Sequence, residues 1–74
     1  MRAKGPVWEW RKARGMSRVA LAQACGMKEW RLARIEAGRE GLPGELQDYL
    51  TERGAHVSSL ASEQSRFITS LRRG

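Results

Sequence analysis

Apolar residues recur along this chain at helical spacing, and glycines at positions 15, 26, 38, 41 and 54 divide it into segments of helical length. The pattern predicts helices over residues 6–14, 17–25 and 28–37, a fourth helix that follows Pro43, and a fifth over residues 57–73. No segment alternates apolar and polar residues as a half-buried strand would. The sequence therefore predicts an all-α fold class, a bundle of about five short helices.

The fifth segment is the most periodic. Its stripe is formed by Val57, Leu60, Ala61, Gln64, Ile68 and Leu71, with Phe67 beside it. In the third segment the same spacing turns Leu32 and Ile35 inward. Ser17 is a favourable N-cap for the second segment, and Pro6 suits the first turn of the first, where its missing N–H costs nothing. At a length of 74 residues, we expect a single domain over residues 1–74.

Charge is distributed unevenly along the chain. The formal net charge is +6, and residues 1–41 carry ten Lys and Arg against four Asp and Glu. Residues 42–65 carry one Arg against four acidic side chains, and three further arginines follow at 66, 72 and 73. A basic half beside an acidic segment is typical of a face directed at a polyanion, although a merely well-solvated surface has the same composition. Nucleic acid is therefore a candidate partner.

The residue content excludes several classes of site. A single cysteine, Cys25, cannot form an internal disulfide, and no Cys/His cluster has metal-ligand spacing, so we expect neither a metal nor another cofactor. No nucleophile, base and oxyanion donor converge, and an enzyme is not expected. No apolar run reaches the roughly 18 residues of a membrane span, and the N-terminus lacks the apolar region of a signal peptide. These observations predict a soluble, cytoplasmic protein without a membrane partner.

Residues 25–27, Cys-Gly-Met, join the second and third predicted helices. Gly26 can take a positive φ without strain from a Cβ atom, so the chain can turn sharply there. Ala22 lies one helical turn earlier, where a larger side chain would hold the helices apart. A small apolar wedge is then closed by Leu21, Cys25, Met27, Leu32 and Ile35. The combination predicts two short helices that cross steeply over a tight turn, with Cys25 as a small core residue and not a redox sensor.

The run SRVALAQACGMKEWRLARIEAGR, residues 17–39, resembles the helix-turn-helix of the lambda repressor-like, Cro/cI-type (XRE) family of DNA-binding proteins. The matching features are Leu21-Ala22, Gly26 four residues on, the apolar Met27, Leu32 and Ile35, and the closing Ile35-Glu36-x-Gly38-Arg39. Upstream, Val7, Trp10 and Arg11 match the family's first helix. The resemblance implies a helix-turn-helix over residues 17–37.

The third helix of such domains lies in the major groove of double-stranded DNA, with its N-terminal half against base edges. On this basis the predicted base-contacting residues are Lys28, Glu29, Trp30 and Arg34. Arg34 can bind guanine O6 and N7 in a bidentate way, Glu29 can accept from cytosine N4, and the ring of Trp30 can cover a thymine methyl group. Three alternatives stay open: a solvated charge for Arg34, packing on a neighbouring helix for Trp30, and a helix-dipole role for Glu29.

Phosphate contacts are expected to supply much of the affinity for DNA. The resemblance places Arg18 and Arg39 where this family meets the DNA backbone, and Arg31 lies near the groove wall. These three arginines are the predicted phosphate-contacting residues. Arg11 and Glu36 have a different role, because the resemblance implies a partly buried, structural ion pair between them.

The fifth segment is longer than a domain of this size needs to close its core. Its first half is expected to complete the core, which leaves an apolar end formed by Phe67, Ile68 and Leu71. We predict that these three residues form a homodimer interface and that the DNA site is an inverted repeat. The alternative is a monomer in which this helix folds back onto Trp8 and Trp10.

The sequence as a whole predicts a sequence-specific transcriptional regulator, most simply a small repressor from a prokaryotic or phage-infected cell. It would bind an inverted-repeat operator as a homodimer. A second hypothesis is an antitoxin or adaptor, in which the C-terminal helix binds a partner protein. A third is an amphipathic helix on a membrane surface over residues 57–73, which its serines and isolated flanking arginines disfavour.

Overall fold

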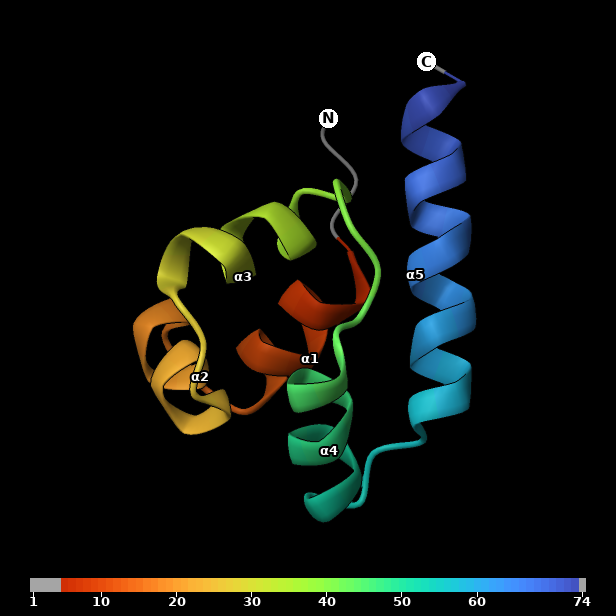
Figure 1. The fold of residues 1–74 in the computed structure, drawn as a ribbon. Coiled ribbons are helices and arrows are strands. Elements are labelled where there is room, and N and C mark those ends of the chain that lie inside the picture. Colours follow the sequence, from red (N-terminus) through yellow and green to blue (C-terminus); the bar gives the residue numbers. More distant parts are fainter. Residues whose placement is uncertain (1–4, 74) are drawn as a thin grey trace.

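The helices lie close to the ranges that the hydrophobic pattern predicts. The computed structural model describes residues 5–73, and within them the elements are α1 (Pro6–Ala13), α2 (Arg18–Cys25), α3 (Glu29–Glu36), α4 (Gly44–Glu52) and α5 (Val57–Arg72). No strand occurs in that range, which confirms the all-α fold class. Figure 1 shows α1 to α4 gathered into one body and α5 standing along one side of it.

The core lies inside the body formed by α1 to α4. Its buried apolar side chains are Val7, Leu21, Ala22, Leu32, Ile35, Leu46 and Leu50. Leu32 and Ile35 are three residues apart on α3, Leu46 and Leu50 are four apart on α4, and Leu21 and Ala22 are neighbours on α2, so each of these helices turns one face inward. Burial of a leucine or isoleucine contributes about 1.5–3 kcal/mol, and truncation to alanine costs about 2–5 kcal/mol because a cavity remains.

The N-terminus of α2 and the turn that follows this helix are both set by local chemistry. Ser17 is the N-cap, and its Oγ accepts a hydrogen bond from the backbone N–H of Ala20 at 3.1 Å. Gly26 ends the helix with φ 73° and ψ 30°, in the left-handed region. The N–H of Met27 then donates to the carbonyl of Ala22 at 3.0 Å, which turns the chain sharply toward α3. The tight turn predicted from Gly26 is present.

A second left-handed glycine ends α3. Gly38 has φ 78°, and the N–H of Arg39 donates to the carbonyl of Arg34 at 2.9 Å. A Cβ atom on Gly38 would overlap the side chain of Leu71 and lie 3.0 Å from the ring of Phe67. The loop after α3 therefore passes directly beneath α5.

α5 packs against α1 and α4 and is held to the end of α3 by one buried polar residue. Gln64 is only 1% exposed, and its Nε2 donates to the carbonyl of Ile35 at 2.8 Å and to that of Glu40 at 2.9 Å. The ring of Phe67 lies so close to Gly5 that a Cβ there would stand 2.6 Å away. α5 is thus docked on its own domain along much of its length.

None of the helices within residues 5–73 is long and apolar enough to cross a membrane.

Candidate nucleic-acid interface

α3 buries one face and leaves the other open to solvent. Leu32 and Ile35 are fully buried against the core. On the open side, Trp30 is 61% exposed and the side chain of Arg34 is 54% exposed. The four predicted base-contacting residues, Lys28, Glu29, Trp30 and Arg34, are all exposed and lie on one short stretch of chain. This face can reach into a groove without any rearrangement of the core.

Trp30 is not buried by a neighbouring helix, although packing of that kind was the alternative for this residue. An indole with most of its surface in water offers a large apolar face to a binding partner. Val19, in the first turn of α2, is a second large apolar residue that is 46% exposed. The helical spacing already turns Val19 away from the buried Leu21–Ala22 face, which is the signal in the sequence for its exposure.

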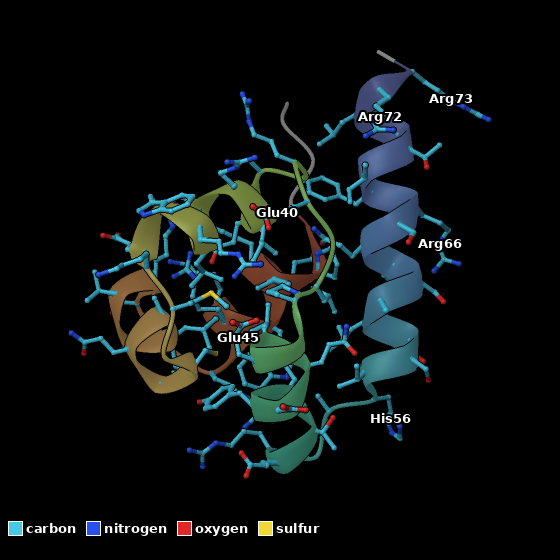
Figure 2. All side chains as sticks on the ribbon, in the orientation of Figure 1. Glu40, Glu45, His56, Arg66, Arg72 and Arg73 are labelled. Carbon is cyan, nitrogen blue, oxygen red and sulfur yellow. The ribbon has the colours of Figure 1, made fainter. Side chains whose placement is uncertain are left out.

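The guanidinium groups of α3 are paired with two acidic residues that no local sequence motif indicates, Glu40 and Glu45. Arg31 Nε and Arg34 Nε each lie 3.4 Å from a different carboxylate oxygen of Glu40, in the loop after α3. Arg31 Nη1 also lies 3.7 Å from Glu45 in the first turn of α4. Figure 2 shows both carboxylates between α3 and the start of α4.

The ion pair expected between Arg11 and Glu36 is present and more extensive than a single contact. Arg11 Nε donates to Glu36 Oε2 at 2.8 Å, and the two side chains are 7% and 4% exposed. Arg18 Nε reaches the same carboxylate at 3.5 Å and stays 42% exposed. Arg18, a predicted phosphate contact, therefore also completes a cluster of two arginines on one buried carboxylate.

This arrangement, with two short helices joined through a left-handed glycine and an exposed second helix, matches a known family. A family model described as a helix-turn-helix domain matches residues 9–53, well over half of the chain. The chain belongs to this helix-turn-helix family. The family is grouped with the Cro/cI-like (XRE) domains, which confirms the resemblance seen in the sequence. Searches of curated proteins and of solved structures gave no match.

Within the helix-turn-helix domain, α2 is the first helix of the motif and α3 the second, which is the helix that reads DNA in such domains. The match ends at residue 53, so α5 lies outside the residues that define the family. Arg39 is exposed immediately after α3. The helix-turn-helix thus presents exposed basic side chains at both ends of its second helix, at Lys28 and Arg39.

The corner between α1 and α2 is the second basic part of the helix-turn-helix surface. An open hollow of about 490 Å³ there is lined by Arg11, Lys12, Gly15, Met16, Ser17 and Arg18. The N-terminus of α2 borders it, and the amide groups of a first helical turn attract phosphate oxygens. The hollow therefore suits a backbone phosphate beside Arg18.

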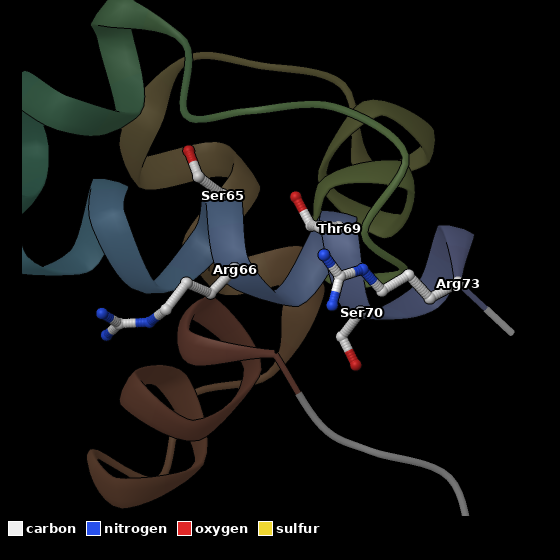
Figure 3. A pocket seen from close by; sticks show the side chains of 5 residues that line it. All are labelled: Ser65, Arg66, Thr69, Ser70 and Arg73. Carbon is white, nitrogen blue, oxygen red and sulfur yellow. The ribbon is translucent and has the colours of Figure 1, made fainter.

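The outer surface of α5 is rich in hydroxyl side chains, in contrast to the surface of the helix-turn-helix. Figure 3 shows Ser65, Arg66, Thr69, Ser70 and Arg73 around a shallow hollow on α5, which has a volume of about 410 Å³. In Figure 1 this helix and the α2–α3 turn stand on opposite sides of the molecule. Of the residues assigned to a dimer interface, Phe67 and Ile68 are half-buried and Leu71 is 45% exposed. Phe67 packs on Gly5 and Gly38 of its own chain, and Leu71 also contacts Gly38 but is the most exposed of the three.

Cys25 is half-buried where α2 ends, and burial raises the pKa of its thiol above the ordinary value of 9.0, with a further contribution from the negative charge of Glu45. The thiol is therefore protonated at neutral pH, as a core residue would be. No group of three or more His, Cys, Asp or Glu within residues 5–73 is placed to hold a metal ion.

Proposed function

We propose that this protein is a sequence-specific transcriptional regulator, a small repressor that binds double-stranded DNA by inserting α3 into the major groove. The observation that carries the proposal is the division of α3 into a buried face, with Leu32 and Ile35, and an exposed face, with Trp30 and Arg34. Family membership supports DNA binding as the general activity. Repression is the simplest mode of regulation, because a protein bound to a promoter blocks the binding of RNA polymerase.

Base recognition is assigned to the exposed face of α3. Arg34 would donate to guanine O6 and N7, and Glu29 would accept from cytosine N4. Trp30 would cover a thymine methyl group, and Lys28 would reach a neighbouring base edge from the start of the helix. The exposure of all four side chains supports this assignment.

Phosphate contacts are assigned to Arg18, Arg31 and Arg39. Arg18 is supported by the basic hollow at the N-terminus of α2. Arg39 is supported by its exposure just beyond α3. Arg31 is the least available of the three for a phosphate, because Glu40 and Glu45 already lie beside its guanidinium group.

We place the protein in the cytoplasm of a prokaryotic or phage-infected cell, on the nucleoid.

A homodimer through α5 is the proposed assembly. It is supported by the exposed Leu71 and by the position of α5, which leaves the helix-turn-helix face clear. Twofold symmetry would present two copies of α3 to one side of a duplex, and the operator would then be an inverted repeat.

The decisive experiment is the selection of bound sequences from a random pool of duplexes. A short motif should be enriched, and it should occur twice in inverted orientation if the protein binds as a dimer. The selected duplex should then bind more tightly than a scrambled duplex of the same length at the same salt concentration. A pool that remains unenriched while the protein stays folded would contradict sequence-specific binding.

An antitoxin or adaptor remains the second candidate function, favoured by the location of α5 outside the family match. In that case α5 would bind a partner protein. The helix-turn-helix would either bind the promoter of the protein's own gene or have no DNA-binding role. Binding of the purified protein to palindromic DNA distinguishes the two functions. A repressor should bind a palindromic duplex selectively without any other protein, whereas a module that acts only through a partner protein should not.

A further inference from the structure

Glu40 is the only residue among those described whose carboxylate is shared by two arginines of α3. Its Oε1 lies 3.4 Å from Arg31 Nε, and its Oε2 lies 3.4 Å from Arg34 Nε. The Glu40 side chain is 26% exposed, less than either arginine. The Glu40 carboxylate lies beside the proposed DNA-binding surface and has the same sign of charge as DNA. It therefore opposes the binding of phosphates, and its presence there calls for an explanation.

The atoms used by this contact suggest what Glu40 does. The ion-pair contact between the carboxylate and Arg34 ends on Nε, at the side of the guanidinium group. The two terminal nitrogens of an arginine carry further N–H donors that can bind other acceptors. A bidentate contact with guanine O6 and N7 can be made end-on by those two nitrogens. Glu40 and a guanine can therefore bind the same arginine at once, from different edges.

The position of Glu40 is itself controlled by the fold. Its carbonyl oxygen accepts a hydrogen bond from Gln64 Nε2 at 2.9 Å, and Gln64 is 1% exposed. The left-handed turn at Gly38 brings the chain back beside α3 just before Glu40. The backbone at Glu40 is thus held in place by Gln64. The two oxygens of the Glu40 carboxylate contact Arg31 and Arg34, which lie one helical turn apart on α3.

We propose that Glu40 is a positioning residue that sets DNA specificity by orienting Arg34 for one guanine and by opposing binding to other sequences. The first effect comes from restricting the rotamers of a long side chain before DNA arrives, so less entropy is lost on binding. The second comes from partial neutralisation of Arg31 and Arg34, which weakens attraction to phosphates at any sequence. This inference rests on the proposed function, in which Arg34 reads a base.

The test compares Glu40→Gln with Glu45→Gln. Both changes remove one negative charge, but of the two α3 arginines that Glu40 contacts, Glu45 forms an ion pair with Arg31 alone, at 3.7 Å. Binding of each variant is measured at one salt concentration to three duplexes: the sequence selected by the wild-type protein, that sequence with its guanine replaced, and a scrambled sequence. Thermal unfolding of each variant verifies that the fold is retained.

The expected result for Glu40→Gln is tighter binding to the scrambled duplex and a loss of about fivefold or more in discrimination at the guanine, which corresponds to about 1 kcal/mol. Glu45→Gln should keep the wild-type discrimination. In an Arg34→Ala background, Glu40→Gln should cause no further loss of discrimination, because the arginine through which it acts is gone.

Wild-type discrimination in a folded Glu40→Gln protein would overturn the inference and leave the proposed function intact. Equal losses in Glu40→Gln and Glu45→Gln would also overturn it, because they would show a general effect of charge. The proposed function fails in a different measurement, namely if the wild-type protein itself selects no sequence from the pool.

Discussion

Glu36 accepts two hydrogen bonds from Arg11, at 2.8 Å from Nε and 3.0 Å from Nη2, and both side chains are buried. The remaining terminal nitrogen of Arg11 donates to the carbonyl of Met16 at 2.9 Å. Because Arg11 belongs to α1 and Glu36 is the last residue of α3, the pair fixes the helix that is proposed to read DNA against the first helix. A buried pair of this kind is sensitive to the loss of either partner, since the other charge then lacks compensation.

Glu36→Ala should therefore destabilise the protein by about 3–5 kcal/mol, and Arg11→Ala by a similar amount. Urea denaturation followed by circular dichroism would measure both free energies of unfolding. Glu52→Ala, at an exposed site on α4, is a matched control that should change stability by no more than about 0.5 kcal/mol. A Glu36→Ala protein as stable as the wild type would show that the pair does not support the fold.

Arg34→Ala should abolish preference at one base position and cost about 1–3 kcal/mol there. Arg39→Ala should instead weaken binding to all sequences alike and flatten its dependence on salt, because a phosphate contact carries no sequence information. Titrations of the selected duplex and its single-base variants at several salt concentrations distinguish the two. If both variants only lower affinity uniformly, base readout does not depend on Arg34.

Gly38→Ala should lower stability more than Gly41→Ala does. At Gly38 a side chain would have to adopt φ 78°, at a cost of about 1–2 kcal/mol, and would also collide with Leu71 and Phe67. At Gly41 an added Cβ meets nothing within 4 Å, so the substitution should be close to neutral. Thermal unfolding of the two variants is the measurement, and equal melting temperatures would contradict the close approach of α5 to this loop.

Leu71→Asp should convert a wild-type dimer into a monomer that keeps its helix content. Leu71 is preferable to Phe67 for this test because Leu71 is 45% exposed although it touches Gly38, whereas Phe67 is half-buried against both Gly5 and Gly38 and its loss would disturb the monomer more. Sedimentation equilibrium reports the mass, and Ser62→Asp places the same charge elsewhere on α5 as a control. A wild-type protein that sediments as a monomer at tens of micromolar and binds DNA as a single copy would exclude the dimer.

Cys25 should resist alkylation in the native protein. Burial raises the pKa of its thiol above 9.0, so the folded state holds the proton at a pH where the unfolded chain begins to lose it. The resulting contribution to stability is present below the pKa of the unfolded thiol and is lost as pH rises through the higher native pKa. Iodoacetamide at mildly alkaline pH should react more slowly with native than with urea-unfolded protein, and equal rates would contradict this environment.

Features that depend on neighbours along the chain can be predicted from the amino-acid sequence alone. The spacing of Leu32 and Ile35 selects the buried face of a helix, and Ser17 and Gly26 mark the beginning and end of another, because these effects act within one or two helical turns. The same local pattern was enough to identify the helix-turn-helix family. Exposure of Arg34 followed from the same spacing, since a residue opposite a buried stripe faces solvent.

The way in which α5 and the loop after α3 pack against each other depends on contacts between distant parts of the chain. Gln64 occupies an apolar stripe in the sequence, yet its amide binds the carbonyls of Ile35 and Glu40. Phe67 was assigned to a dimer interface, and the structure packs it on Gly5 and Gly38. These contacts join residues far apart in the chain, so they depend on the angle at which α5 docks and on the path of a loop. Helical periodicity encodes neither of these, because it specifies which face of a helix is buried and leaves open the surface that buries it.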